Sequence, residues 1–368
     1  MEASRRVSLG RIIAQGLVPA TAARSTLDAV ENLAALQGQQ ASAIPWAIGV
    51  RCAGVSRARV EESFARGELV RSWPMRGTIH VTSARDHHWL RRLLRHRRAS
   101  WERQALALGL TAALVERAAQ VACDLLETSP LGVSRAELVE AWGSSGIDTV
   151  TASSSQDGLR RRHLIMRLHV DGVLTAGPVR AGEHLIVDAR SLPAAPGVAK
   201  GEPGHEEALA VLAARYAWGH GPVDEADLAR WTGLTLTEAR RALAGARVAG
   251  ENVGLPLAEC GGGLARANLT DLVEDFRAEA EAMLALPSFD ELHVGYKDRS
   301  CLTDEAGEAL ICPAKNGMFR PIAVAGGRVV AVRAPGSQVV TADGCGTYEE
   351  SARRAFGDWE KWLSERQQ

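Results

Sequence analysis

The chain has 368 residues, of which 46% are hydrophobic and 24% are charged, and its formal net charge is −1. This balance is typical of a globular protein and excludes a disordered chain, while the length predicts two to four domains. No run approaches the roughly 18 consecutive apolar residues of a membrane helix, and the N-terminal residues lack the apolar core of a signal peptide. We therefore expect a cytoplasmic protein without membrane contact.

The cysteine and histidine spacings do not favour a metal site. The six cysteines are far apart, and no two form a Cys-x-x-Cys pair, which argues against a zinc ribbon, an iron–sulfur cluster or a disulfide framework. His87 and His88 are adjacent, and His163 and His169 are six residues apart, so neither pair has the spacing of metal ligands on a helix. The sequence predicts neither a metal nor a cofactor, and it agrees with a reducing cytosol.

The charges are unevenly distributed along the chain. Between Arg71 and Arg103 there are nine arginines and two acids, whereas acids dominate from Asp271 to Glu291. Such asymmetry favours a basic surface that faces a polyanion, and phosphates are the usual partner. A solvated, arginine-rich helical protein without a ligand is the alternative.

Residues 1–110 are predicted to form a first module. A capping box at Ser25 opens an apolar helix, and this pattern is broken at Gly38. Residues 68–82 alternate apolar and polar side chains around a turn, which predicts a hairpin, and Ser83 then caps another helix. The order is helix, hairpin, helix.

Two further modules of helices followed by a hairpin are predicted in residues 111–192 and 205–260. In the second of these, helices begin at Asp224 and Thr235, which is the spacing of a helix-turn-helix whose second helix can enter a groove. We expect the wing of that module at Asn252–Leu257. Repeated modules of this kind favour DNA binding.

Residues 264–368 have a different pattern. An acidic amphipathic helix is followed by short β-like runs around the turn Gly326-Gly327, and a final helix is expected at residues 348–366. This pattern predicts a small β-rich domain with helical flanks. The fold class of the whole chain is therefore α+β.

Three glutamines stand where the first apolar helix is predicted to end, in Leu36-Gln-Gly-Gln-Gln40. On a continuing helix Gln37 and Gln39 would point about 200° apart. Both amides can converge if Gly38 ends the helix in a left-handed or extended conformation. Glutamines that only cap the helix end are the alternative interpretation.

Three segments carry a resemblance to a known family. They are Leu-Gln-Gly-Gln at 36–39, Arg-Ser-Trp-Pro-Met-Arg-Gly-Thr-Ile-His at 71–80 and Leu-Pro-Ser-Phe-Asp-Glu-Leu-His-Val-Gly-Tyr-Lys-Asp-Arg at 286–299. Together they resemble the AlkZ-type winged-helix DNA glycosylases, over nearly the whole chain and in the same order. The resemblance implies three tandem winged helices and a C-terminal β-barrel-like domain, C-shaped around double-stranded DNA.

The same resemblance implies that Gln37 and Gln39 are the catalytic pair. The family usually has an aliphatic residue between the two glutamines, where this chain has Gly38. A glycine would loosen the geometry of the pair, although both amides remain present.

The implied reaction is hydrolysis of the N-glycosidic bond of alkylated bases. An N7-alkylguanine carries a positive charge, so the leaving base needs no general acid, and the enzyme must position a water at C1′ and stabilise an oxocarbenium-like transition state. Two amide oxygens can do both. We therefore expect selectivity for cationic adducts, with N7-methyl lesions, bulky natural-product adducts and interstrand crosslinks all left open.

Lysine usage bears on the mechanism, because bifunctional glycosylase-lyases commonly use an amine to form a Schiff base. No lysine precedes Lys200, so none is near Gln37 in the sequence. We expect a monofunctional, monomeric hydrolase that leaves an abasic site in base excision repair, with genotoxin resistance as one use.

Candidate DNA contacts come from the first hairpin, the second module and the C-terminal half of the chain. They are Arg71, Arg76, His80, Arg160, Arg161, Arg162, Lys297, Arg299, Lys315 and Arg320. An ordinary wing that packs on its own helices is the alternative for the hairpin. A winged-helix transcription regulator, or a structural chromosomal protein, would explain the repeats and the arginines, but neither gives the Gln-x-Gln segment a purpose.

Overall fold

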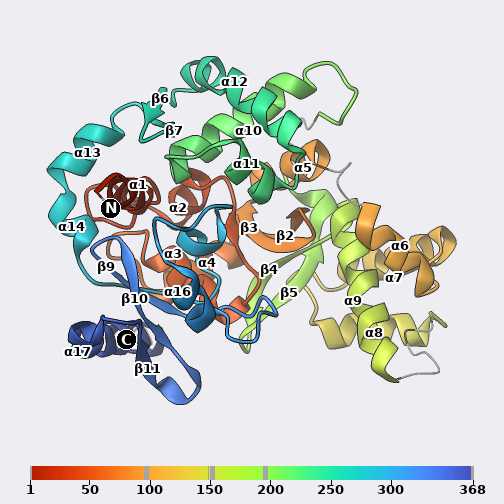
Figure 1. Cartoon of the computed structure of the whole chain (residues 1–368). Helices are drawn as coiled ribbons and strands as arrows, with labels where there is room; N and C mark the ends of the chain where they lie inside the picture. Colours follow the sequence, from red (N-terminus) through yellow and green to blue (C-terminus); the bar gives the residue numbers. More distant parts are fainter. Residues whose placement is uncertain (1, 95–98, 148, 150–153, 194–197, 366–368) are drawn as a thin grey trace. The chain divides into compact units, whose positions relative to one another are not determined.

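The computed structural model describes residues 2–94, 99–147, 149, 154–193 and 198–365 (Figure 1). As expected, the chain mixes helices and antiparallel strands. It folds into two compact units. The central unit is Glu61–His205, and the composite unit combines Met1–Val60 with Glu206–Gln368. These units are coarser than the four predicted segments, whose boundaries stay predictions.

The central unit contains two hairpins and five helices within the described residues. The strands are β2 (Leu69–Met75), β3 (Thr78–Ser83), β4 (Leu174–Arg180) and β5 (Glu183–Asp188), and the helices are α5 (Ala84–Leu93), α6 (Ala99–Ala107), α7 (Ala112–Glu127), α8 (Arg135–Ser144) and α9 (Ser154–Asp171). The strand order within this unit is β3-β2-β4-β5, and every pair is antiparallel. The two predicted hairpins therefore share one sheet.

Local signals explain the first hairpin and the helix that follows it. Arg76 has φ 39° and Gly77 has φ 71°, the left-handed pair that a two-residue hairpin turn requires, and Met75 lies opposite Thr78. Ser83 then accepts a hydrogen bond from the Asp86 backbone N–H as the N-cap of α5. Both predictions are confirmed. Residues 95–98, which belong to the predicted basic run, lie outside the described part of the chain.

Helices α7, α8 and α9 of the central unit lie together (Figure 1), and their apolar residues form a core that includes Trp142. Trp142 of α8 is fully buried, and its indole N–H donates to the Ala118 carbonyl of α7 at 2.9 Å. Helix α8 begins with a capping box, because Ser134 and Glu137 bond each other's backbone N–H.

The composite unit is built from both ends of the chain. Its α-helices are α1 (Glu2–Ala14), α2 (Thr26–Asn32), α3 (Ile44–Gly49), α10 (His205–His220), α11 (Glu225–Thr232), α12 (Leu236–Asn252), α13 (Leu269–Asp275), α14 (Arg277–Glu281), α15 (Glu291–Val294), α16 (Glu305–Ile311) and α17 (Glu349–Ser364). Its strands are β1 (Leu36–Gln37), β6 (Leu257–Cys260), β7 (Gly263–Arg266), β8 (Leu284–Leu286), β9 (Ile322–Ala325), β10 (Arg328–Arg333) and β11 (Val339–Thr341). Helix α4 (Arg57–Ala65) crosses the boundary between the units.

The helix-turn-helix is confirmed, but its wing lies elsewhere than predicted. Helix α11 ends at Gly233 with φ 81°, and Thr235 opens α12 with a capping box. The prediction of a wing at Asn252–Leu257 is wrong, because α12 runs to Asn252 and a loop follows. The hairpin is β6–β7, since Gly261 and Gly262 supply the positive φ angles that its turn needs.

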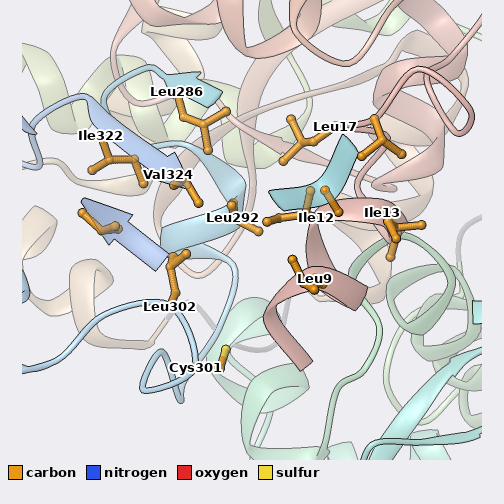
Figure 2. Close-up of a cluster of buried hydrophobic side chains, with 14 of the residues drawn as sticks. Leu9, Ile12, Ile13, Leu17, Leu286, Leu292, Cys301, Leu302, Ile322 and Val324 are labelled. Carbon is orange, nitrogen blue, oxygen red and sulfur yellow. The ribbon is translucent and has the colours of Figure 1, made fainter. Parts of the chain in front are cut away.

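The C-terminal strands form one antiparallel sheet in the order β11-β10-β9-β8. Ile322 and Val324 pack with residues of α1 such as Ile12 (Figure 2). The alternate residues of the strands, among them Ala323, face a second core to which α17 contributes Phe356. The sheet is thus covered on both faces. The expected barrel is not confirmed, because β11 and β8 stay at the edges of an open sheet among the described strands.

The central unit should lose stability in acid because it buries neutral histidines. Burial lowers the pKa of His169 to about 3 and that of His184 to about 4, and it lowers the pKa of His87 well below its ordinary value. Below about pH 6.5 the unfolded chain binds protons that the native unit rejects, so each histidine should lower the free energy of unfolding by about 1.4 kcal/mol per pH unit. Urea unfolding at pH 7.5 and pH 5.5 measures this.

His169→Gln removes one of these groups. The slope of the free energy of unfolding against pH should therefore fall by about 1.4 kcal/mol per pH unit, which corresponds to one proton. An equal pH dependence in the variant and in the wild type would contradict this explanation.

Candidate functional site

The helix that precedes the glutamine segment ends earlier than the sequence predicted. Helix α2 ends at Asn32, and Ala34 takes the left-handed φ of 58° that reverses the chain, so the prediction that the helix reaches Gly38 is wrong. Gln37 then lies in the short strand β1. An extended backbone at Gln37 removes the divergence of about 200° that a helix would impose on Gln37 and Gln39.

The three glutamines differ in their exposure. The side chain of Gln37 is buried, Gly38 is buried, and Gln39 is half-buried. Gln40 is exposed, and its side-chain amide donates to the Ser42 hydroxyl at 3.1 Å. The segment therefore runs from the core to the surface within four residues.

A buried carboxylate holds the peptide of Gln37. The Gln37 backbone N–H donates to Glu291 Oε2 at 2.9 Å. The other oxygen, Oε1, accepts the Trp231 indole N–H at 2.7 Å and lies 3.2 Å from His220 Nε2. Glu291 has no exposed surface. Sequence reasoning missed Glu291, and its only signal was a pair of acids within the apolar part of the 286–299 segment.

The preceding acid fixes the start of α15. Asp290 accepts two hydrogen bonds from Arg51, each at 2.8 Å, and it caps the Leu292 backbone N–H at 2.9 Å. Arg51 also donates to Gln15 Oε1 at 2.7 Å, and both members of the ion pair are buried. A bidentate pair with this geometry is among the strongest that proteins form. It ties α15 to the N-terminal segment.

Aromatic rings surround the Glu291 carboxylate. Tyr216 stacks on His220 with ring centroids 4.5 Å apart, and it lies 4.8 Å from Trp231. Tyr216 donates its hydroxyl to the Gly295 carbonyl at 2.8 Å, and burial raises the pKa of this phenol well above its ordinary value. The phenol therefore stays neutral and keeps its role as a donor. The rings exclude water from the carboxylate.

A cavity of about 630 Å³ lies beside the end of the glutamine segment. Gln40 and Ser42 line it from one side, and Met318, Phe319 and Trp359 contribute apolar walls. Arg320 and Arg333 also line it, so the cavity combines an apolar surface with positive charge.

The predicted contacts on the first hairpin are not equally accessible. His80 has no exposed surface, and its Nδ1 lies 3.1 Å from the Thr78 carbonyl. Arg71 is half-buried, and burial lowers its pKa to about 10. Arg76 is half-buried and donates to the Thr78 hydroxyl at 3.2 Å. Their contacts with DNA stay predictions.

The arginines of α9 are more accessible. Arg162 is exposed, while Arg160 and Arg161 are half-buried. Arg161 donates to the Asp157 carbonyl one turn earlier at 3.3 Å. Among them, Arg162 is the best placed to meet a phosphate from solvent.

In the C-terminal half, two of the four predicted cations are held by neighbouring groups. Arg299 pairs with Glu308 at 3.2 Å, and Arg320 donates to the Leu310 carbonyl at 3.2 Å. Lys297 and Lys315 are exposed. Their roles in binding DNA also stay predictions.

The described residues contain neither a metal-ligand cluster nor a membrane-spanning helix. They hold no cluster of three or more histidine, cysteine, aspartate or glutamate side chains that is arranged for a metal ion. Within the same part of the chain, no helix combines the length and apolar character needed to cross a membrane.

Comparisons with known proteins agree on one family. The family model described as DNA glycosylase AlkZ-like matches residues 30–356. The structure is similar to that of the Streptomyces sahachiroi DNA glycosylase AlkZ, with a TM-score of 0.66, 23% sequence identity and 96% of each chain covered. At this identity the likeness shows a shared fold. No curated protein matches the chain by sequence.

Removing Asp290 should destabilise the composite unit. Asp290→Ala leaves the Arg51 guanidinium buried without its carboxylate, which should lower the free energy of unfolding by about 3–5 kcal/mol. Replacing both partners, as Arg51→Met with Asp290→Leu, removes the stranded charge and should recover much of this loss. Urea unfolding of both variants measures the effect, and a loss below about 1 kcal/mol in Asp290→Ala would contradict it.

Proposed function

The chain belongs to the AlkZ-like DNA glycosylase family, and from this premise we propose that it hydrolyses the N-glycosidic bond of cationic N7-alkylguanines in double-stranded DNA. The observation that carries the proposal is the Gln-x-Gln segment, which is extended at Gln37 and bonded through its backbone to Glu291. A transcription regulator would have no use for a glutamine segment whose backbone is held by a buried carboxylate.

The proposed chemistry needs little from the protein. Alkylation at N7 puts a positive charge on the base, so the base leaves without a general acid. The amide oxygens of Gln37 and Gln39 would orient the attacking water and present negative dipoles to the positive charge that develops at C1′. Gln39 is half-buried, so its side chain is in reach of a substrate that arrives from solvent.

We propose that the enzyme is monofunctional and leaves an abasic site. Lyase chemistry commonly needs an amine that attacks C1′. The lysines of the chain are Lys200, Lys297, Lys315 and Lys361, and none stands near Gln37 in the sequence.

The cavity beside the glutamine segment supports a substrate range that extends beyond methyl adducts. Its volume of about 630 Å³ lies within the 300–1,000 Å³ that is typical of small-molecule sites. A substituent carried on N7, including a bulky natural product or a crosslink, would find apolar walls at Met318 and Phe319 there. Resistance to a genotoxin would follow from such a range.

Binding of the duplex would rest on the helix-turn-helix formed by α11 and α12, on further winged-helix modules and on exposed cations such as Arg162. We propose that one chain curves around the DNA and works as a monomer in the bacterial cytoplasm.

Loss of the two amides should abolish excision and spare DNA binding. Gln37→Ala combined with Gln39→Ala removes both groups proposed to orient the water, and the single-turnover rate should fall at least about 100-fold. Release of the base from a duplex that contains N7-methylguanine measures the rate. The exposed Gln120→Ala on α7 is the matched control and should keep the wild-type rate.

Two outcomes would contradict different parts of this proposal. If the wild type binds the duplex but releases no base above background, the glycosylase function is wrong. If the double variant excises at the wild-type rate, the function stands and the assignment of the two glutamines is wrong.

The Kd for duplex DNA should depend steeply on salt concentration, because the proposed contacts between the protein and the phosphates are electrostatic. Arg162→Ala removes one exposed cation and should lower the slope of log Kd against log salt by about 0.9. Arg353→Ala on α17 is the control, since this arginine is exposed and pairs with Glu349 one turn earlier. Fluorescence anisotropy with an undamaged duplex gives both slopes, and an unchanged slope in Arg162→Ala would remove this residue from the interface.

A further inference from the structure

We propose that Glu291 is a positioning residue for the glutamine pair: it fixes the peptide of Gln37 and thereby the place from which the two amides act. This inference rests on the proposed glycosylase function. It concerns a residue that contacts the backbone of the segment and acts on the substrate only through Gln37.

The contacts of Glu291 require a group that only accepts hydrogen bonds. Oε2 accepts the Gln37 backbone N–H, and Oε1 accepts the Trp231 indole N–H, which can act only as a donor. A glutamine in this place would present its own N–H₂ to one of these two donors, whichever way its amide is turned. A carboxylate satisfies both at once.

The histidine beside the carboxylate supplies a third donor. His220 Nε2 lies 3.2 Å from Glu291 Oε1, while Nδ1 has no hydrogen-bond partner among the described residues. A proton on Nδ1 would leave a buried donor unsatisfied and would turn a lone pair towards the carboxylate. Nε2 therefore carries a proton and donates it to Glu291.

Burying the Glu291 carboxylate costs desolvation free energy. The groups that bond it come from distant parts of the sequence. Gln37 lies 254 positions before Glu291, His220 lies 71 before it and Trp231 lies 60 before it. Stabilising α15 alone would not require a charge in this place, because buried charges are expensive to desolvate. The Glu291 side chain instead accepts a backbone N–H of the glutamine segment.

Glu291 is itself rigidly placed. The neighbouring Asp290 forms its bidentate pair with Arg51, and Arg51 donates to Gln15. The position of the Gln37 peptide is therefore set from a fixed point. Catalytic groups need placement to within about 0.5 Å, and an error of about 1 Å can cost roughly 100-fold in rate.

Glu291→Gln tests the inference on the full chain. It turns an N–H₂ group towards one of the two donors, so the single-turnover excision rate on an N7-methylguanine duplex should fall about 100-fold, while Kd for the same duplex changes less than about threefold. Glu281→Gln is the matched control: it makes the same change at a half-buried glutamate of α14 that pairs with Arg5 at 3.0 Å, outside the groups proposed to bind or act on DNA. This control should excise within about twofold of the wild type.

A second substitution separates positioning from a general loss of stability. In Glu291→Gln with Trp231→Phe, the indole donor is gone, so the new amide can turn its N–H₂ to that side and accept the Gln37 N–H with its oxygen. His220 can accept from the amide by moving its proton to Nδ1. The double variant should excise at least about tenfold faster than Glu291→Gln, although shrinking a buried tryptophan lowers the melting temperature further.

The outcomes are distinguishable. A wild-type rate in Glu291→Gln, or a double variant that is no faster than Glu291→Gln, overturns the inference and leaves the glycosylase function intact. A wild type that releases no base overturns the function itself. If Glu291→Gln does not fold, Glu291→Asp keeps an acceptor-only carboxylate that is one methylene shorter, and about a tenfold loss is expected; a wild-type rate in that variant overturns the inference.

Discussion

The composite unit depends on two carboxylates, Asp290 and Glu291, which are consecutive in the sequence and both buried. Their hydrogen-bond partners are of different kinds. Asp290 is neutralised by the Arg51 guanidinium, whereas Glu291 accepts the N–H groups of Gln37 and Trp231 and lies beside a ring nitrogen of His220. Burying a charge is tolerated only when its lone pairs are satisfied. Asp290 and Glu291 therefore dictate which segments must meet, and they draw the N-terminal segment, α10 and α11 together around α15.

Short-range signals allowed much of the secondary structure to be predicted. The predicted helix starts at Ser83 and Thr235 and the turn of the first hairpin were confirmed, since each depends on residues within three or four positions. The end of α2 was predicted wrongly because the apolar pattern of the sequence continues beyond the helix. Leu33 to Leu36 continue a helical apolar pattern, yet they are buried by tertiary packing after α2 has ended at Asn32.

Only the glutamines of the candidate site could be predicted from the sequence. The glutamines drew notice through family resemblance and through their unusual place after an apolar run. Glu291 did not, because an acid in a sequence is normally solvated, and its burial depends on contacts 254 positions away. Exposure was likewise beyond sequence reasoning. His80 was predicted as a contact on a hairpin and proves to have no exposed surface.

The distance along the chain between Gln37 and Glu291 has a consequence for synthesis. A ribosome adds about 5–20 residues per second, so the glutamine segment emerges roughly 10–50 s before the carboxylate that holds it, given their separation of 254 positions. Until then the Gln37 N–H lacks the Glu291 carboxylate, and the sheet formed by β8 to β11, which packs against α1, does not yet exist. A chain that stops before residue 291 would carry both glutamines without the carboxylate that fixes the Gln37 peptide.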